Sequence, residues 1–298
     1  MKRYLSIVAF SLLLGLACHA TNRALLVSID TYQDKDWNDI HATNDTRVIT
    51  DALKSHGFAQ EHIATLNNEA ATHDAIVKAI KDLTRDCKRN PGGIVYVHFS
   101  CHGQQMDDLN GQEADNLCES IIPYDARQKA TSSYHGEKHL PDYELVPLLE
   151  ALRAAIGPKG QLLLVVDACH SDGIEAMRGI SPSRRGSDTK FTRGDGTAKK
   201  SGYRRHRNRP ARNTAKSKNM CPQLSLKAAQ AAKQCSEMWD PAVKTKKRTS
   251  RDIYGKLSYH LCQAINNQAA GKFNVSEIES KLISMKIDGI HINKKTNH

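Results

Sequence analysis

Two apolar runs in the middle of the chain decide its fold: Gly93-Ile-Val-Tyr-Val-His-Phe-Ser100 and Gln161-Leu-Leu-Leu-Val-Val-Asp167. Unbroken apolar runs of about five to eight residues are typical of strands that are buried on both faces of a sheet. Shorter runs of the same kind occur at residues 23–29, 62–66 and 223–228. We therefore expect five strands.

Helical patterns separate these strands. From Asn44 onward, and again after Thr72, apolar residues recur at intervals of three and four, and Thr72 is a typical N-cap. Further helices are expected at residues 143–155, 254–265 and 274–283. The alternation of strands and helices predicts an α/β fold with a mostly parallel sheet covered by helices on both faces.

The composition is that of a globular protein with one unusual segment. The chain has 298 residues, of which 39% are hydrophobic and 25% are charged, which excludes a wholly disordered chain. The net charge of +11 is concentrated between Arg178 and Lys218, where 14 Lys and Arg face only two Asp. The rest of the chain is therefore close to neutral, and the basicity does not mark the whole protein as a nucleic-acid binder.

The first 20 residues have the composition of a secretory signal peptide. Lys2 and Arg3 precede an apolar run at residues 5–17, which is too short for a comfortable membrane span. Cys18-His-Ala20 fits a cleavage site before Thr21, and we expect a secreted or periplasmic protein without a transmembrane segment in its mature chain. The alternative is lipid anchoring at Cys18.

Reactive side chains follow the two strands that decide the fold. One strand leads into Ser100-Cys-His-Gly-Gln104, and the other leads into Asp167-Ala-Cys-His-Ser171. In open α/β sheets, functional groups collect at the carboxyl ends of the strands, so His102 and Cys169 are expected to face each other there. A thiol beside an imidazole is the minimum equipment for covalent acyl transfer, and Gly103 suits a backbone donor in an oxyanion hole.

Other interpretations of these residues remain open. A lone Cys or His at a strand end is commonly a packed core residue. Zinc binding by two Cys-His dipeptides is disfavoured, because neighbouring residues on a strand point to opposite faces and metal sites use wider spacings.

The two motifs together resemble those of the caspase-fold cysteine peptidases, and more closely the metacaspases than the animal caspases. The histidine motif is Tyr96-Val-His-Phe-Ser-Cys-His-Gly-Gln104, and the nucleophile motif is Asp167-Ala-Cys-His-Ser171. The resemblance extends over about residues 22–285, including the opening Ala24-Leu-Leu-Val-Ser-Ile-Asp30 and a region after the basic segment similar to the small subunit. It implies a three-layer αβα caspase-like sandwich with a mostly parallel central sheet.

Carried over to this chain, the resemblance implies that Cys169 is the nucleophile and His102 the general base. Metacaspases accept Arg or Lys before the scissile bond in an acidic pocket, whose positions here correspond to Asp45 and Asp167, with Ser100 in the wall. Two carboxylates in a partly desolvated pocket bind a guanidinium strongly and reject an acidic side chain. The alternative role for Asp45 is that of a helix cap beside Asn44.

The resemblance also raises calcium as a possible activator, although the Cys-His chemistry itself requires no cofactor. Asp115 and Asp142 correspond to acidic loop residues that bind calcium in many metacaspases, and hard cations prefer several carboxylate oxygens. The sequence departs from the pattern at Tyr143, where a second Asp is typical, and at Cys118, which replaces an acidic residue.

The chain divides into a signal peptide (residues 1–20), a large-subunit region (21–177), a disordered basic linker (178–222) and a small-subunit-like region (223–298) that completes the same domain. The linker has three interpretations: a solvated loop without a task, a site of self-cleavage after Arg178, Arg184 or Arg185, or a polyanion-binding segment. Specific nucleic-acid binding is disfavoured, because no aromatic residue beyond Tyr203 is interleaved with the basic ones.

The sequence thus predicts an exported cysteine endopeptidase that cleaves protein or peptide substrates after Arg or Lys. One alternative is a catalytically silent caspase-like module that binds a partner or a polyanion through the basic segment. Another is a cysteine transferase or hydrolase that acts on a non-peptide acyl group.

Overall fold

The fold is described from a computed structural model. The description covers residues 20–108, 117–168, 185–187, 189–192, 219–228 and 236–296. The predicted signal peptide, apart from Ala20, lies outside these residues, and its prediction stays untested.

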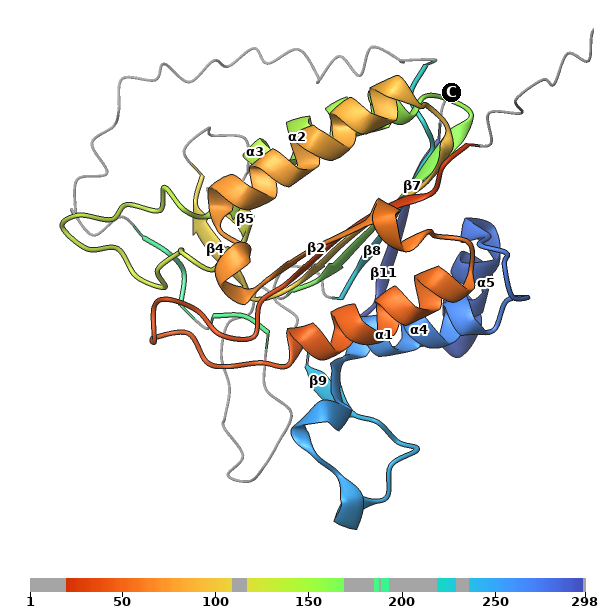
Figure 1. Ribbon diagram of the computed structural model, residues 1–298. Coiled ribbons are helices and arrows are strands. Elements are labelled where there is room, and N and C mark those ends of the chain that lie inside the picture. Colours follow the sequence, from red (N-terminus) through yellow and green to blue (C-terminus); the bar gives the residue numbers. More distant parts are fainter. Residues whose placement is uncertain are drawn as a thin grey trace, which may run out of the picture.

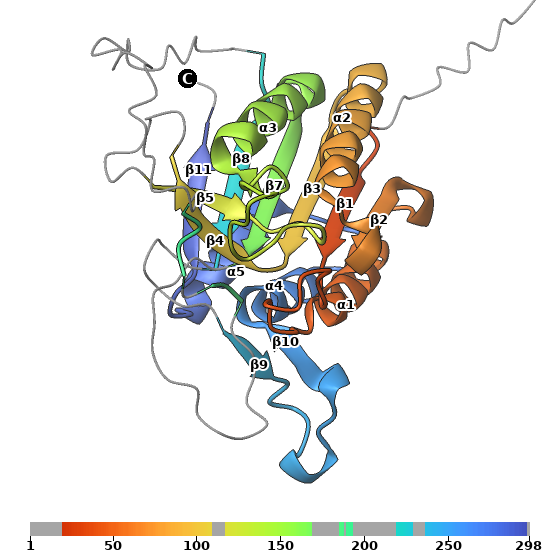
Figure 2. The same cartoon turned by 90° about the vertical axis from the view of Figure 1, so that its left-hand side faces the viewer.

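A six-stranded sheet forms the centre of the molecule, with its strands side by side in Figure 2. All neighbouring strands are parallel except the edge strand β11, which is antiparallel to β8. The spatial order is β11 (His291–Lys295), β8 (Gln223–Lys227), β7 (Gly160–Asp167), β3 (Gly93–Ser100), β1 (Arg23–Ser28) and β2 (Ile63–Asn67). The predicted α/β fold with a mostly parallel sheet is confirmed.

Helices cover both faces of this sheet and make three layers (Figure 1). One face carries α2 (His73–Arg89) and α3 (Asp142–Ile156), and the other carries α1 (Ala42–Ser55), α4 (Lys256–Asn266) and α5 (Val275–Met285). Each face has its own hydrophobic core, because alternate strand residues point to opposite sides. Within the described residues, no helix has both the length and the apolar character needed to cross a membrane.

The local signals in the sequence account for several helix ends. The Thr72 side chain accepts a hydrogen bond from Ala75 N and caps α2, as its position predicts. Asn274 caps α5 by accepting from Ser276 N and Glu277 N. Asp45, in contrast, makes no capping bond, since α1 begins after His41 and has no side-chain cap.

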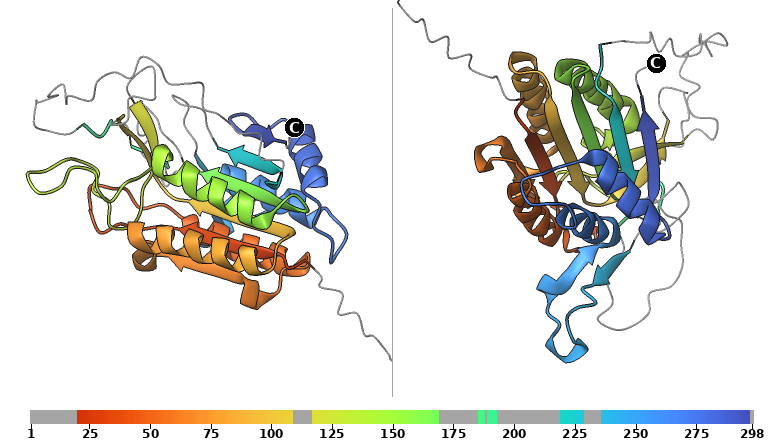
Figure 3. Two further views of the ribbon diagram at one scale, coloured as in Figure 1. Left: turned by 90° about the horizontal axis from the view of Figure 1, so that it is seen from above. Right: turned by 90° about the vertical axis from the view of Figure 1, so that its right-hand side faces the viewer.

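Several short strands were not visible as patterns in the sequence, and they surround the ends of β3 and β7. A three-stranded sheet consists of β4 (Gly103–Asp107), β5 (Leu117–Ile121) and β6 (Leu140–Pro141), with β4 at its edge. A second small sheet pairs β9 (Glu237–Trp239) with β10 (Ile253–Gly255). Figure 3 shows both small sheets beside the central one.

A buried histidine connects three elements of the core. His98 Nε2 donates to Ser258 Oγ (3.1 Å), because the Ser258 hydroxyl is itself the donor to Asp167 Oδ2 (2.6 Å). His98 Nδ1 therefore accepts from the Tyr96 hydroxyl (3.0 Å). Burial lowers the pKa of His98 to about 4, so the ring is neutral and joins β3, β7 and α4 through hydrogen bonds.

We expect the free energy of unfolding to decrease as the pH falls from about 6.5 towards about 4. Burial lowers the pKa of His98, His102 and His139 to about 4, so the unfolded chain binds protons that the folded chain does not. The stabilisation is complete above the unfolded value of 6.5 and is lost through this window, at up to about 1.4 kcal/mol per pH unit for each histidine.

Chemical denaturation at several pH values measures this dependence. His98→Gln keeps a donor for Ser258 but removes one titrating group, and its stability should depend less steeply on pH. A free energy of unfolding that stays constant from about pH 7 to about pH 5 contradicts the neutral, buried state of these rings.

Candidate active site

The register between β3 and β7 sets the geometry of the predicted dyad. Ser100 lies opposite Asp167, and Cys101 N donates to the Asp167 carbonyl oxygen (3.4 Å). His102 and Cys169 each follow two residues after this pair in sequence. The structure thus confirms that the two motifs leave neighbouring strands at the same edge, whereas Cys169 itself lies outside the described residues.

His102 is held in a closed aromatic site and is only 1% exposed. Its ring stacks on Trp37 (centroids 5.1 Å apart, 22° between planes) and also contacts Tyr32 at 5.1 Å. Nε2 donates to the Asn38 carbonyl oxygen (2.7 Å), which leaves the lone pair on Nδ1. Burial lowers the pKa of His102 to about 4, against the opposing effect of the Asn38 hydrogen bond, so the ring is a neutral base near pH 7.

The cysteines that the structure describes are poor nucleophiles. Burial raises the pKa of Cys101 to about 12, although this residue neighbours His102. The same cause raises the pKa of the other four to about 11 or 12: Cys87, Cys118, Cys221 and Cys262. Because the thiolate is the reactive form, none of these five thiols replaces Cys169 as the candidate nucleophile.

The predicted specificity residues come together beside His102. Ser100 Oγ donates to Asp45 Oδ2 (2.7 Å), and Asp45 Oδ1 accepts from Gly255 N (3.0 Å). Asp167 Oδ2 accepts from Ser258 N at 2.8 Å as well as from the Ser258 hydroxyl. Asp45 and Asp167 have no exposed surface, so the interpretation of Asp45 as a helix cap is wrong.

This group of carboxylates surrounds the guanidinium of Arg185. Arg185 Nη1 lies 2.7 Å from Asp45 Oδ2 and 3.7 Å from Asp167 Oδ2, and it donates to Ser100 Oγ at 2.6 Å. The whole side chain is buried. Burial raises the pKa of Asp45, while the positive charge of Arg185 opposes that rise. We call Asp45, Ser100, Asp167 and Glu237 the carboxylate pocket.

Glu237, the fourth member of the carboxylate pocket, was not found from the sequence. Its Oε1 accepts from Arg185 Nη2 (3.1 Å) and from His41 N (2.6 Å), and its Oε2 lies 2.9 Å from His41 Nδ1. Burial raises the pKa of Glu237, but the bonds from His41 and the charge of Arg185 outweigh it, so the net pKa is lowered. The same hydrogen bond from Glu237 raises the pKa of His41, against the opposing effect of burial.

The position of Arg185 corrects the interpretation of the basic linker. We expected a disordered basic linker at residues 178–222, yet in its described part Arg185 is fully buried and the segments 185–187 and 189–192 lie against β4. The reason is electrostatic, since a guanidinium compensates carboxylates that could not otherwise remain charged in the interior. Arg178 and Arg184 lie outside the described residues.

Gly103 begins β4 directly after His102 and is buried. Its carbonyl oxygen accepts from Ser187 N (3.2 Å), so the segment after Arg185 passes this residue. The assignment of Gly103 N as an oxyanion donor stays a prediction.

Comparison with known proteins agrees with this geometry. The profile of the caspase domain matches residues 21–286, which is most of the chain. The chain belongs to the caspase-domain family. This is a family of cysteine peptidases, and the predicted caspase-like sandwich is therefore confirmed.

Its relatives include metacaspases. The chain is 34% identical over 158 residues to Metacaspase-1 of Plasmodium falciparum, covering 50% of this chain and 24% of that protein. It is 28% identical over 162 residues to Metacaspase-1A of Aspergillus oryzae, covering 52% and 35%. This chain thus spans only about a third or less of the length of these relatives. A crystal structure of a Geobacter sulfurreducens protein has the same fold, with a TM-score of 0.59, 18% identity and 92% of each chain covered.

The described part of this caspase domain does not assemble a calcium site. Asp142 begins α3, whereas Asp115 lies outside the described residues. Among the residues that the structure describes, no three His, Cys, Asp or Glu side chains gather in a metal-holding group. Calcium prefers six to eight oxygen ligands, so we derive no step of the chemistry through it.

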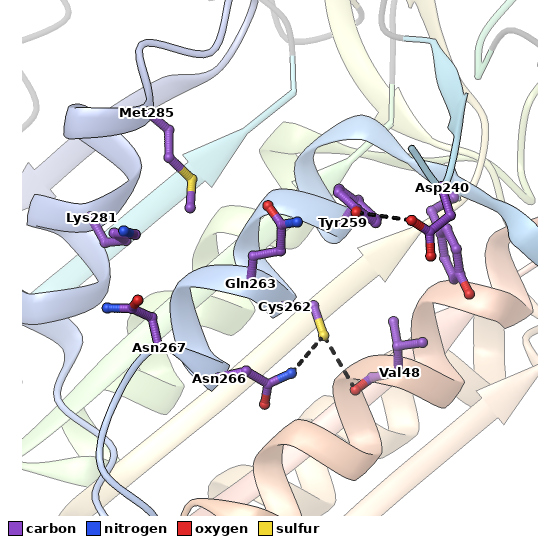
Figure 4. A pocket seen from close by; sticks show the side chains of 10 residues that line it. Val48, Asp240, Tyr259, Cys262, Gln263, Asn266, Asn267, Lys281 and Met285 are labelled. Carbon is purple, nitrogen blue, oxygen red and sulfur yellow. Dashed lines mark hydrogen bonds between the residues drawn. The ribbon is translucent and has the colours of Figure 1, made fainter. Parts of the chain in front are cut away.

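A separate hollow lies away from the dyad, between α1, α4 and α5, with a volume of about 550 Å³ (Figure 4). Tyr259 donates to Asp240 (3.1 Å) at one end, and the Cys262 thiol donates to the Val48 carbonyl oxygen (3.6 Å). The hollow contains neither His102 nor a member of the carboxylate pocket, so we do not assign the chemistry of the caspase domain to it.

Trp37→Ala should raise the pKa of His102 from about 4 towards its ordinary value of 6.5, because burial is the main cause of the low value. The change also removes a buried ring and should cost roughly 3–5 kcal/mol of stability. Titration of the histidine ring signals by NMR measures the pKa in the folded variant.

Trp37→Phe is the matched control. It keeps a ring against His102 and removes only the hydrogen bond from the indole N–H to the Ala126 carbonyl oxygen (3.0 Å). A pKa that is the same in Trp37→Ala and in the wild type shows that Trp37 does not keep water from His102.

Proposed function

We propose that this protein is an exported cysteine endopeptidase that cleaves peptide bonds after Arg or Lys, using Cys169 and His102. The observation that carries the specificity is the Arg185 side chain in the carboxylate pocket. Membership of the caspase-domain family supports the reaction type, and the apolar segment at residues 5–17 supports export.

The chemistry follows from the protonation state of His102. In the proposed first step, Nδ1 takes the proton of the Cys169 thiol, and the thiolate attacks the backbone carbonyl carbon of the bound Arg. The C–N bond then breaks, and the imidazolium gives its proton to the leaving amine. In the second step His102 takes a proton from water, and the oxygen attacks the thioester carbonyl carbon. The C–S bond breaks, the imidazolium returns its proton to the Cys169 sulfur, and the carboxylate product leaves.

The pocket is better suited to arginine than to lysine. Nη1 of Arg185 contacts Asp45 and Ser100, while Nη2 donates to Glu237. Both terminal nitrogens of the planar guanidinium therefore have partners. The charge of lysine lies on a single nitrogen, which cannot contact both groups of partners in the same way. The carboxylates exclude Asp and Glu side chains from this position by like-charge repulsion.

Arg185 also makes the chain a candidate substrate of its own active site. Its side chain occupies the position proposed for the residue before the scissile bond, and Gly186 follows directly. We propose that the bond between Arg185 and Gly186 is cut in the chain itself. Until then, Arg185 competes with substrates for the carboxylate pocket.

Fluorogenic peptides ending in Arg, Lys, Asp or Ala test the proposed activity, with and without calcium. We expect cleavage of the Arg peptide, weaker cleavage of the Lys peptide and none of the Asp peptide. Cys169→Ala and His102→Ala should each abolish turnover, and the double variant should lose little more, because the two act as one unit. An effect of added calcium tests the predicted calcium dependence separately.

Glu237→Gln tests the pocket at a residue outside the dyad. Losing one charged hydrogen-bond partner should cost roughly 1.5–3 kcal/mol of transition-state binding. We therefore expect kcat/KM for the Arg peptide to fall about ten- to a hundredfold, with a smaller fall for the Lys peptide. Preferential cleavage after Asp, or an unchanged ratio of Arg to Lys cleavage in Glu237→Gln, contradicts the pocket assignment.

Self-processing predicts two fragments that meet at Arg185 and Gly186. We expect wild-type protein to be cut there, and Cys169→Ala and Arg185→Gln to remain intact at this bond. The fragments should stay associated, because β7 precedes the cut, β8 follows it, and the two strands pair in one sheet. Denaturing gels, native mass and mass spectrometry of the fragments measure these outcomes.

Cys169→Ala serves as the control for contaminating proteases. Cutting of this variant at the same rate as wild type assigns the event to another enzyme. Wild-type protein that stays intact while it cleaves the Arg peptide disproves self-processing but leaves the peptidase activity in place.

A further inference from the structure

The segment after Arg185 lies along the edge of β4 and bonds to it at two points, Ser187 and Phe191. Ser187 N donates to the Gly103 carbonyl oxygen (3.2 Å), and Phe191 N donates to the Gln105 carbonyl oxygen (2.8 Å). Asp107 N donates in return to the Phe191 carbonyl oxygen (3.2 Å), and Phe191 forms a parallel bridge with Met106. Pairing of an extended segment with a sheet edge is a general mode of peptide recognition.

The Phe191 side chain is packed among side chains at the edge of the small sheet. Its side chain is only 1% exposed, and its ring lies 4.5 Å from His139 and 5.8 Å from Tyr134, the latter at 90°. Gly136 leaves the space for the ring, because a Cβ there would stand 3.0 Å from Phe191 Cε1. We call Met106, Tyr134, Gly136 and His139 the aromatic socket.

The side-chain polar atoms of the aromatic socket are hydrogen-bonded to one another and to Gln104. Tyr134 OH donates to His139 Nδ1 (2.8 Å), and His139 Nε2 donates to Gln104 Oε1 (3.0 Å). Burial lowers the pKa of His139 to about 4, so the ring remains neutral against an apolar guest. Gln104 Nε2 also donates to the Thr189 carbonyl oxygen (2.8 Å), which connects the socket to the backbone of the added segment.

One segment of the chain connects the carboxylate pocket with the aromatic socket. Arg185 occupies the carboxylate pocket, the next residues run along β4 beside His102, and Phe191 enters the aromatic socket six residues after Arg185. The backbone contacts at Gly103, Gln105 and Asp107 use only main-chain atoms of the segment, so other sequences can make them. The socket is the part that selects a side chain.

We propose that the aromatic socket is a substrate-binding subsite for a large aromatic side chain six residues after the cleaved Arg. This inference rests on the proposed function, in which the carboxylate pocket binds the residue before the scissile bond. In the uncut chain, Phe191 occupies the subsite. An aromatic ring suits it because the perpendicular Tyr134 ring gives the edge-to-face contact that aromatic pairs prefer, and the His139 ring packs against the guest at 4.5 Å with a tilt of 53°.

Binding measurements on protein without its nucleophile test the subsite independently of catalysis. The protein is the full chain with Cys169→Ala, Arg185→Ala and Phe191→Ala, which vacates both sites. The probe is a labelled peptide with the sequence of residues 185–192, measured by fluorescence anisotropy. We expect its Phe→Ala version to bind at least tenfold more weakly, whereas equal affinities of the two peptides overturn the proposal.

A third peptide, with Ala in place of Arg, separates this proposal from the proposed function. If it binds as tightly as the parent peptide, the carboxylate pocket does not recognise Arg, and the proposed function fails. The comparison of the Phe and Ala peptides still decides whether the aromatic socket binds a ring. The control is the chain with Cys169→Ala alone, in which Phe191 still fills the aromatic socket. In this protein the affinities of the Phe and Ala peptides should differ less.

A second variant guards against loss of folding in the triple variant. Phe191→Ala with Cys169→Ala keeps Arg185 in the carboxylate pocket and empties only the aromatic socket. A peptide of residues 187–192 should bind this variant, and its Phe→Ala version should bind at least tenfold more weakly. Phe273→Ala, which removes a partly buried ring on the opposite face of the sheet, is the matched control and should show no such discrimination.

Discussion

The parallel pairing of β3 with β7 is the constraint on which the rest of the molecule depends. Because Ser100 lies opposite Asp167, the histidine motif and the nucleophile motif leave the sheet side by side. The same pair contributes two walls of the carboxylate pocket. A shift of this register by one residue would turn the side chains of one strand to the other face and separate these groups, so stability and chemistry impose the same alignment.

Much of the fold could be predicted because its signals are local. The apolar runs that become β1, β3 and β7 and the cap at Thr72 depend on near neighbours in the sequence. The histidine motif and Asp45 also followed from the sequence, the latter only through the resemblance. The carbonyl group of Asn38 could not be predicted, since any residue offers the same backbone oxygen to His102. Glu237 was missed because it approaches His41 from a distant part of the chain.

The carboxylate pocket shows why composition alone predicted the wrong environment for Arg185 in the basic segment. A run rich in Arg, Lys, Ser and Gly has no core-forming pattern, and most such runs remain in solvent. The guanidinium of Arg185 is nevertheless buried, because three buried carboxylates lie around it. The surroundings are closely fitted, since a side chain at Gly255 would overlap both Asp167 and Arg185. Charge compensation at a distance of many residues therefore decides the place of Arg185, and no window of sequence contains that information.

The edge position of β4 has a consequence for contacts with other chains. The added segment covers backbone groups of Gly103, Gln105 and Asp107 that would otherwise face outward on an unpaired edge. An uncovered edge next to an apolar hollow is a template on which a second chain can add its own strand. The segment pairs with these groups, and its removal would leave the edge of β4 open to pairing with a strand of a second chain.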